Sequence, residues 1–116
     1  MGSENKFESY DFYKLDSNGN KILTDLTNGR VFSFEDWFIC FGYTKESILK
    51  EIEANINFLE SQIKYYLKEI RSGCEEYDQP EKMVLHFLGK LEESVYTQAY
   101  WEYTLEAAHE YFEQVK

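Results

Sequence analysis

The stretch from Thr44 to Ser72 constrains the fold more than any other part of this chain. Its large side chains recur at alternating spacings of four and three residues, which makes a seam of Ile52, Ile56, Leu59, Ile63, Tyr66 and Ile70. This spacing is typical of a helix that packs along one side against another helix. Thr44 is a favourable N-cap, and Gly73 follows the last turn. We therefore expect one long helix over residues 44–72, about 43 Å in length at 1.5 Å per residue.

The region before this helix has turn signals and short apolar runs instead of a helical repeat. The polar start of the chain predicts a flexible tail over residues 1–8. The segment 16–20 and the pair Asn28-Gly29 favour tight turns between extended segments. Residues 9–33 therefore predict a small antiparallel β-meander.

A short helix is expected between the meander and the long helix, over residues 34–42. Ser33 is its candidate N-cap, with Asp36 three residues later, as in a capping box. Its large apolar side chains, Trp37, Phe38 and Phe41, predict a buried plug that ties the meander to the helices.

The C-terminal third predicts further helix, over residues 79–115. Asp78 is a candidate N-cap, and Pro80 is tolerated in the first turn, where its missing N–H has no partner. Gly89 leaves open a break into two helices near position 89. The short loop before Pro80 favours antiparallel packing on the long helix. The fold class is therefore α+β, with an N-terminal meander and short helix followed by a long antiparallel helical hairpin.

Length and charge narrow the function classes. At 116 residues the chain, residues 1–116, is expected to form a single domain. Its formal net charge of −10 repels nucleic acid and anionic membranes and attracts basic partners. The polar N-terminus and the lack of an apolar run of membrane-spanning length predict a cytoplasmic protein, in a bacterium or a host cell.

The two cysteines do not suggest a disulfide framework. Cys40 lies in an apolar run and is expected to be buried, whereas Cys74 lies in a polar loop.

The last predicted helix has acidic residues at spacings of four, four and three: Glu102, Glu106, Glu110 and Glu113. This spacing places the four carboxylates on one helix face, with about 6 Å between successive turns. Phosphates along a DNA strand have a similar separation. The face is therefore a candidate polyanion mimic, and a solvated helix face is the alternative.

Further candidates for partner binding flank this stripe. Aromatic residues are enriched at interface hot spots, and the C-terminal helix has more large rings than one buried stripe needs. The candidates outside the stripe are Glu75, Glu76, Asp78, Tyr100 and Trp101.

Glu106-x-x-His109 resembles half of a carboxylate-bridged metal site of a helical bundle. Such a site needs a second copy of the motif, and the chain has only one. We therefore expect no metal and no cofactor, and no catalytic residues are assigned.

These features favour binding over catalysis. We expect a small acidic inhibitor that blocks the nucleic-acid channel of a basic partner protein, itself a nucleic-acid-binding enzyme. In composition the chain resembles phage anti-CRISPR and antirestriction proteins, without sharing a motif with them. The alternatives are an immunity protein or antitoxin for a basic nuclease, a small metal-dependent enzyme, and a homodimeric structural protein. Direct binding to nucleic acid or to a membrane is not expected.

Overall fold

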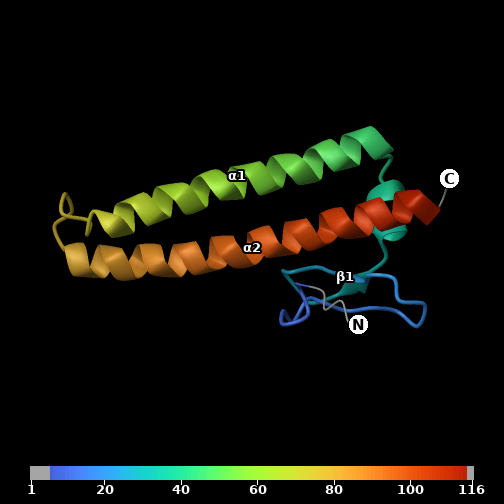
Figure 1. Cartoon of the computed structure of the whole chain (residues 1–116), viewed down its shortest axis with the longest axis horizontal. Coiled ribbons are helices and arrows are strands. Elements are labelled where there is room, and N and C mark those ends of the chain that lie inside the picture. The colour runs from blue at the N-terminus through green and yellow to red at the C-terminus, as the bar shows by residue number, and fades with distance from the viewer. Residues whose placement is uncertain (1–5, 115–116) are drawn as a thin grey trace. The chain divides into compact units, whose positions relative to one another are not determined.

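The computed structural model of the chain describes residues 6–114. Its elements, in chain order, are β1 (Leu23–Thr24), β2 (Val31–Phe32), the short helix η1 (Glu35–Ile39), α1 (Lys45–Arg71) and α2 (Pro80–Gln114). A two-stranded antiparallel sheet thus precedes a short helix and two long helices (Figure 1), which confirms the α+β fold class and the helical hairpin.

The contacts of the chain divide it into two compact units. Unit 1 contains the chain up to Glu53 together with the part from Glu102 onward, and unit 2 contains Ala54–Trp101. Each long helix contributes to both units, and the two units are described separately below.

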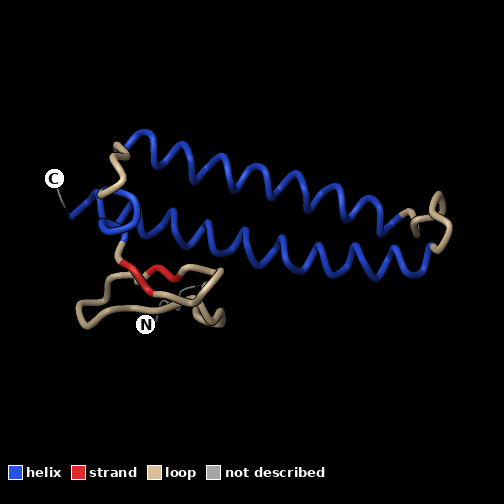
Figure 2. The backbone as a smooth tube through the Cα atoms, turned by 180° about the vertical axis from the view of Figure 1, so that it is seen from behind, coloured by secondary structure: helices blue, strands red, loops and turns tan. Residues whose placement is uncertain are grey.

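In unit 1 the expected meander is reduced to very short strands. β1 and β2 pair antiparallel through Leu23↔Phe32 and Thr24↔Val31, around a turn in which Gly29 has a φ of 74°. Before β1, the described part of the predicted meander has a single bridge, Leu15↔Lys21, and Figure 2 shows mostly loop there. Residues 7–13 instead form consecutive turns, since Tyr10 N–H donates to the Phe7 carbonyl and Tyr13 N–H to the Tyr10 carbonyl.

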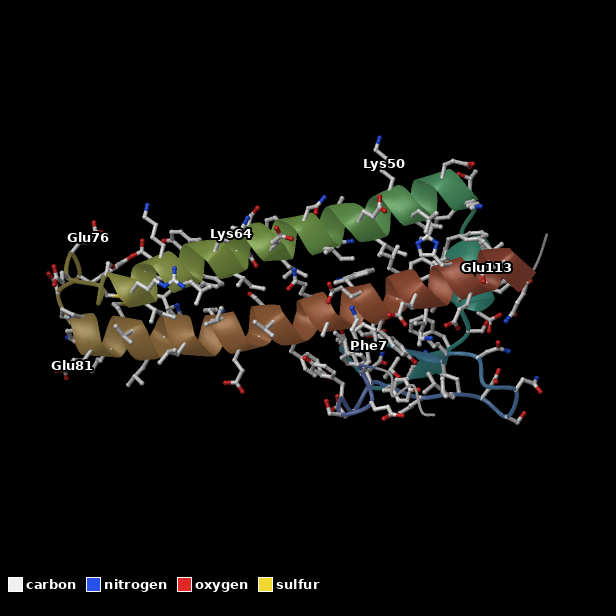
Figure 3. The ribbon with its side chains drawn as sticks, viewed as in Figure 1. Phe7, Lys50, Lys64, Glu76, Glu81 and Glu113 are labelled. Atoms are coloured by element: carbon white, nitrogen blue, oxygen red, sulfur yellow. The ribbon has the colours of Figure 1, made fainter. Side chains whose placement is uncertain are left out.

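The core of unit 1 is built around Tyr103 of α2, which is fully buried. The rings of Phe7 and Phe12 pack on it with centroids 5.8 and 5.2 Å away. The Tyr103 hydroxyl lies 2.8 Å from the Lys14 carbonyl oxygen, which also accepts a hydrogen bond from Ile22 N–H, and 2.9 Å from the Ile22 carbonyl oxygen. It therefore connects α2 with the backbone on both sides of the 16–20 turn. Phe7 is therefore packed, although the sequence predicted a flexible tail there (Figure 3); residues 1–5 of that tail lie outside the described residues.

The short helix η1 is wound as a π-helix, since Cys40 N–H donates to the Glu35 carbonyl at 3.1 Å. Ser33 Oγ accepts a hydrogen bond of 3.0 Å from Asp36 N–H, which confirms the predicted cap. The helix ends at Ile39, short of the predicted position 42, and Gly42 then turns the chain with a φ of 86°.

Both ends of α1 are held by local hydrogen bonds. Thr44 and Ser47 cap its start reciprocally, because each side-chain oxygen accepts from the other residue's N–H, at 3.1 and 2.8 Å. At its end Gly73, with a φ of 72°, donates to the Ile70 carbonyl, and Cys74 N–H donates to the Glu69 carbonyl. This pair of bonds is a Schellman motif, so the helix ends within one residue of the predicted position.

The helix α2 runs without interruption through Gly89. The alternative of two helices broken near position 89 is therefore wrong. A glycine inside a helix costs only about 1 kcal/mol relative to alanine, too little to break a helix held by packing on both sides of it. In unit 2, Leu59 of α1 and Phe87 of α2 are buried, and the rings of Tyr66 and Phe87 lie 5.8 Å apart.

The expectation of a buried Cys40 is wrong, because this residue is exposed. Cys74 is fully buried, because the Schellman motif folds it back on α1, where its thiol lies 3.5 Å from the Glu69 carbonyl oxygen. Burial raises the pKa of the Cys74 thiol.

Candidate functional site

Two acids of the α2 stripe form an ion pair with a lysine inside unit 1. Glu102, Glu106 and Glu110 are half-buried and Glu113 is exposed. The ammonium group of Lys21 lies 3.5 Å from Glu106 Oε1 and also binds Glu110 Oε2. The side chain of Lys21 is only 7% exposed, whereas those of its two partners are 39% and 41% exposed. The two central acids of the stripe therefore hold an internal counter-charge that the sequence analysis did not foresee.

This ion pair changes what the stripe can do. Glu106 and Glu110 still reach solvent, but one of their two charges is balanced by Lys21. Reversing both charges would place two lysines beside a third, so a loss of binding could not be separated from damage to the fold.

A cavity of about 560 Å³ opens beside this ion pair, within unit 1. Its charged lining consists of Asp16, Lys21, Glu35 and Glu110, and its aromatic walls are Phe32, Phe34 and Tyr111. We call this cavity the Lys21 pocket. A cavity of this size with aromatic walls and a few polar groups has the general form of a ligand or side-chain binding site.

The pocket keeps a negative charge at neutral pH. The pKa of Asp16 is lowered, chiefly because the Asn20 N–H donates to its carboxylate at 2.9 Å. Burial raises the pKa of the Tyr111 phenol, and the nearby charge of Glu35 adds to the effect. The Tyr111 phenol therefore stays neutral, and the Asp16 carboxylate stays ionised.

Exposed apolar side chains lie on β2, on η1 and two residues after the end of η1. Val31, Trp37 and Phe41 are 56%, 41% and 74% exposed. The rings of Phe32 and Trp37 stack with centroids 4.4 Å apart, and Phe41 meets the edge of Trp37 at 6.3 Å. We call these four residues the aromatic ridge; Val31 and Phe32 also line the Lys21 pocket.

The ridge corrects the expectation of a buried plug. Of the three residues predicted to form the plug, only Phe38 is buried. A helix as short as η1 packs one face, so Trp37 and Phe41 remain exposed. The number of rings in so short a segment was the available signal, because one helical face cannot bury them all.

The remaining predicted residues lie in unit 2. Glu75, Glu76 and Asp78 are exposed in the loop between α1 and α2, where Figure 3 labels Glu76. Tyr100 is only 8% exposed and meets the half-buried Trp101 edge to face at 5.7 Å. Tyr100 thus contributes to packing, whereas the loop acids are accessible.

Metal binding finds no support in the arrangement of the Glu-x-x-His motif. Glu106 contacts Lys21, and His109 is exposed. Across residues 6–114, no three His, Cys, Asp or Glu side chains are grouped so that they could hold a metal ion. Within the same range, neither long helix has the length of apolar sequence that a membrane span needs.

Comparison with known proteins found no matching family model, no similar curated protein and no similar solved structure. Function is therefore inferred from the chain's own residues.

Proposed function

We propose that this protein is a binding protein that inhibits a basic partner by covering its nucleic-acid-binding surface, as phage anti-CRISPR and antirestriction proteins do. The observation that carries the proposal is the exposed aromatic ridge beside the acidic Lys21 pocket. Tryptophan and phenylalanine supply binding energy at interfaces, and a surrounding negative charge selects a basic partner.

Unit 1, to which the ridge belongs, carries most of the net charge of the chain. Unit 1 has fourteen acidic and seven basic residues, whereas unit 2 has eight acidic and five basic residues. Unit 1 therefore carries a net charge of −7 out of −10. Such a field attracts basic surfaces at distances up to the screening length, about 8–10 Å at physiological salt.

The exposed rings would give the complex its lifetime. Charges at the rim of an interface act mainly on the rate of encounter, while buried aromatic anchors act on dissociation. Trp37 and Phe41 project beyond the packed part of η1 and can be covered without a change in fold. The acids of the stripe and of the 75–78 loop would then act as additional attractive charges.

An immunity protein or antitoxin for a basic nuclease would use the same face. A partner that does not cleave nucleic acid would exclude this second function. A homodimeric structural role is favoured by a different observation: in unit 2, Leu85, Leu88 and Val95 of α2 are exposed at spacings of three and seven residues.

The proposal is tested by capture and competition. The immobilised protein is used to capture proteins from a bacterial extract, bound proteins are eluted with duplex DNA, and each is purified and assayed for DNA binding in the presence of this protein. The test variant is Trp37→Ala with Phe41→Ala. The matched control is Phe58→Ala with Leu85→Ala, which removes exposed apolar side chains of unit 2, at 61% and 69% exposure.

We expect a partner whose DNA binding is inhibited by the parent and by the control variant, but much less by the ridge variant. Equal inhibition by the ridge variant would contradict the proposed face. A partner that binds this protein and DNA at the same time would contradict the proposed mechanism.

A further inference from the structure

Resting on the proposed function, we propose that the Lys21 pocket receives an arginine side chain of the partner. Charge attraction alone does not specify which basic side chain of the partner makes the anchoring contact.

The walls of the pocket suit a flat cation. The half-buried rings of Phe32 and Tyr111 line the pocket, and the buried Phe34 packs against Tyr111 with ring centroids 5.2 Å apart, which holds Tyr111 in place. A guanidinium group stacks on aromatic faces and is less strongly hydrated than an ammonium group, so it loses less on entering such a site. The volume of about 560 Å³ leaves room for the aliphatic stem of the side chain as well.

The charges of the pocket select a cation over an anion. Asp16, Glu35 and Glu110 line it, whereas the lining contains one basic residue, Lys21. The charge of Lys21 is already shared between Glu110 and Glu106, so it is balanced before any ligand enters. An arginine would find carboxylate oxygens for its five N–H donors, whereas a phosphate or carboxylate would meet repulsion.

The position of the pocket connects this contact with the aromatic ridge. Val31 and Phe32 belong to both, so a chain segment whose arginine enters the pocket also reaches the ridge. Apolar side chains near the arginine could then cover Trp37. The expected partner surface is therefore an arginine flanked by apolar residues, as distinct from a diffuse basic patch.

The experiment uses a small probe, so that it does not depend on finding the partner. N-acetyl-arginine-amide is titrated into the ¹⁵N-labelled protein, and amide chemical shifts are followed. N-acetyl-citrulline-amide, which has nearly the same shape but no charge, is the matched probe. We expect saturable shifts at the residues that line the pocket, and binding of the citrulline probe about tenfold weaker, as for hydrogen bonds to charged groups.

Two substitutions place the binding in the pocket. Glu35→Gln removes an exposed charge of the lining and should weaken binding of the arginine probe by about two- to fivefold, the range for exposed charge pairs. Glu113→Gln removes an exposed acid of the stripe that does not line the pocket, and it should leave the affinity unchanged.

Equal affinity for the two probes would overturn the proposal. So would shifts spread over all acidic surfaces, or equal effects of the two substitutions. If the pocket fails to bind the probe while the ridge variant still loses its partner, the arginine contact is wrong and the proposed function stands. If the probe binds but no captured partner loses DNA binding, the pocket binds arginine and the proposed function is wrong.

Discussion

Lys21 should contribute more to stability than an ordinary surface lysine, because its ammonium group is enclosed between two carboxylates. The perturbation that tests this is Lys21→Met, which keeps the length and the apolar stem of the side chain. It leaves Glu106 and Glu110 one helical turn apart without the cation that separates their charges.

The magnitude lies between two known limits. Removing one partner of a fully buried ion pair costs about 3–5 kcal/mol, whereas an exposed pair contributes about 0.2–1 kcal/mol. Lys21 is 7% exposed, but its partners are about two-fifths exposed and can be solvated when it is lost. We therefore expect a loss of about 2 kcal/mol in the free energy of unfolding, or roughly 8 °C in the melting temperature for a chain of this length.

Thermal unfolding followed by circular dichroism measures this loss. The control is Lys50→Met, an exposed lysine that points away from α1 in Figure 3 and should change the melting temperature by little. Adding Glu110→Gln to Lys21→Met should restore part of the stability, because it removes the repulsion with Glu106. If Lys21→Met and Lys50→Met melt at the same temperature, the enclosed ion pair does not stabilise unit 1 and the reasoning is refuted.

Three further predictions concern Tyr103, the two cysteines and Asp16. Tyr103→Phe should cost about 1 kcal/mol, since it removes the hydroxyl's hydrogen bonds to the part-buried backbone of Lys14 and Ile22 but keeps the ring; a melting temperature equal to that of the parent would contradict this. Iodoacetamide should alkylate the exposed Cys40 in the native protein and the buried Cys74 only after denaturation, as peptide mass spectrometry would show. The lowered pKa of Asp16 gives stability that is present above the ordinary value of 3.8 and is lost as pH falls through the lowered pKa. Asp16→Asn should therefore flatten the acid side of the profile of melting temperature against pH, and an unchanged profile would exclude this role.

The long helices could be predicted because their signals are local. The cap formed by Thr44 and Ser47 and the turn at Gly73 depend on residues a few positions apart, and both are readable in the sequence. The strands were predicted less accurately than the helices. The segment before β1 is held by hydrogen bonds with Tyr103, which lies 89 positions from Lys14, and no local sequence pattern reports such a contact.

The candidate site shows the same division. The acidic stripe follows from helical spacing, and the structure places its residues on α2 as expected. The enclosure of Lys21 by two of these acids again joins residues more than 80 positions apart, so the sequence suggested a free acidic face. Exposure of Trp37 and Phe41 depends on how much of η1 packs, which apolar character alone does not decide.

The central claim is that the acidic and aromatic face of unit 1 covers a basic surface of a partner. The most direct measurement is the affinity of the captured partner for the parent and for Glu35→Lys with Glu113→Lys, across a range of salt concentrations. Both positions are exposed, and neither forms the ion pair with Lys21. The control is Glu81→Lys with Glu93→Lys, an equal change of charge at exposed positions of unit 2.

We predict that the unit 1 reversal weakens binding strongly at low salt, that the difference narrows as salt rises, and that the control retains most of the affinity. Circular dichroism should show both variants folded, since lysine is as good a helix former as glutamate. Equal affinities of parent and unit 1 reversal at every salt concentration would contradict the claim.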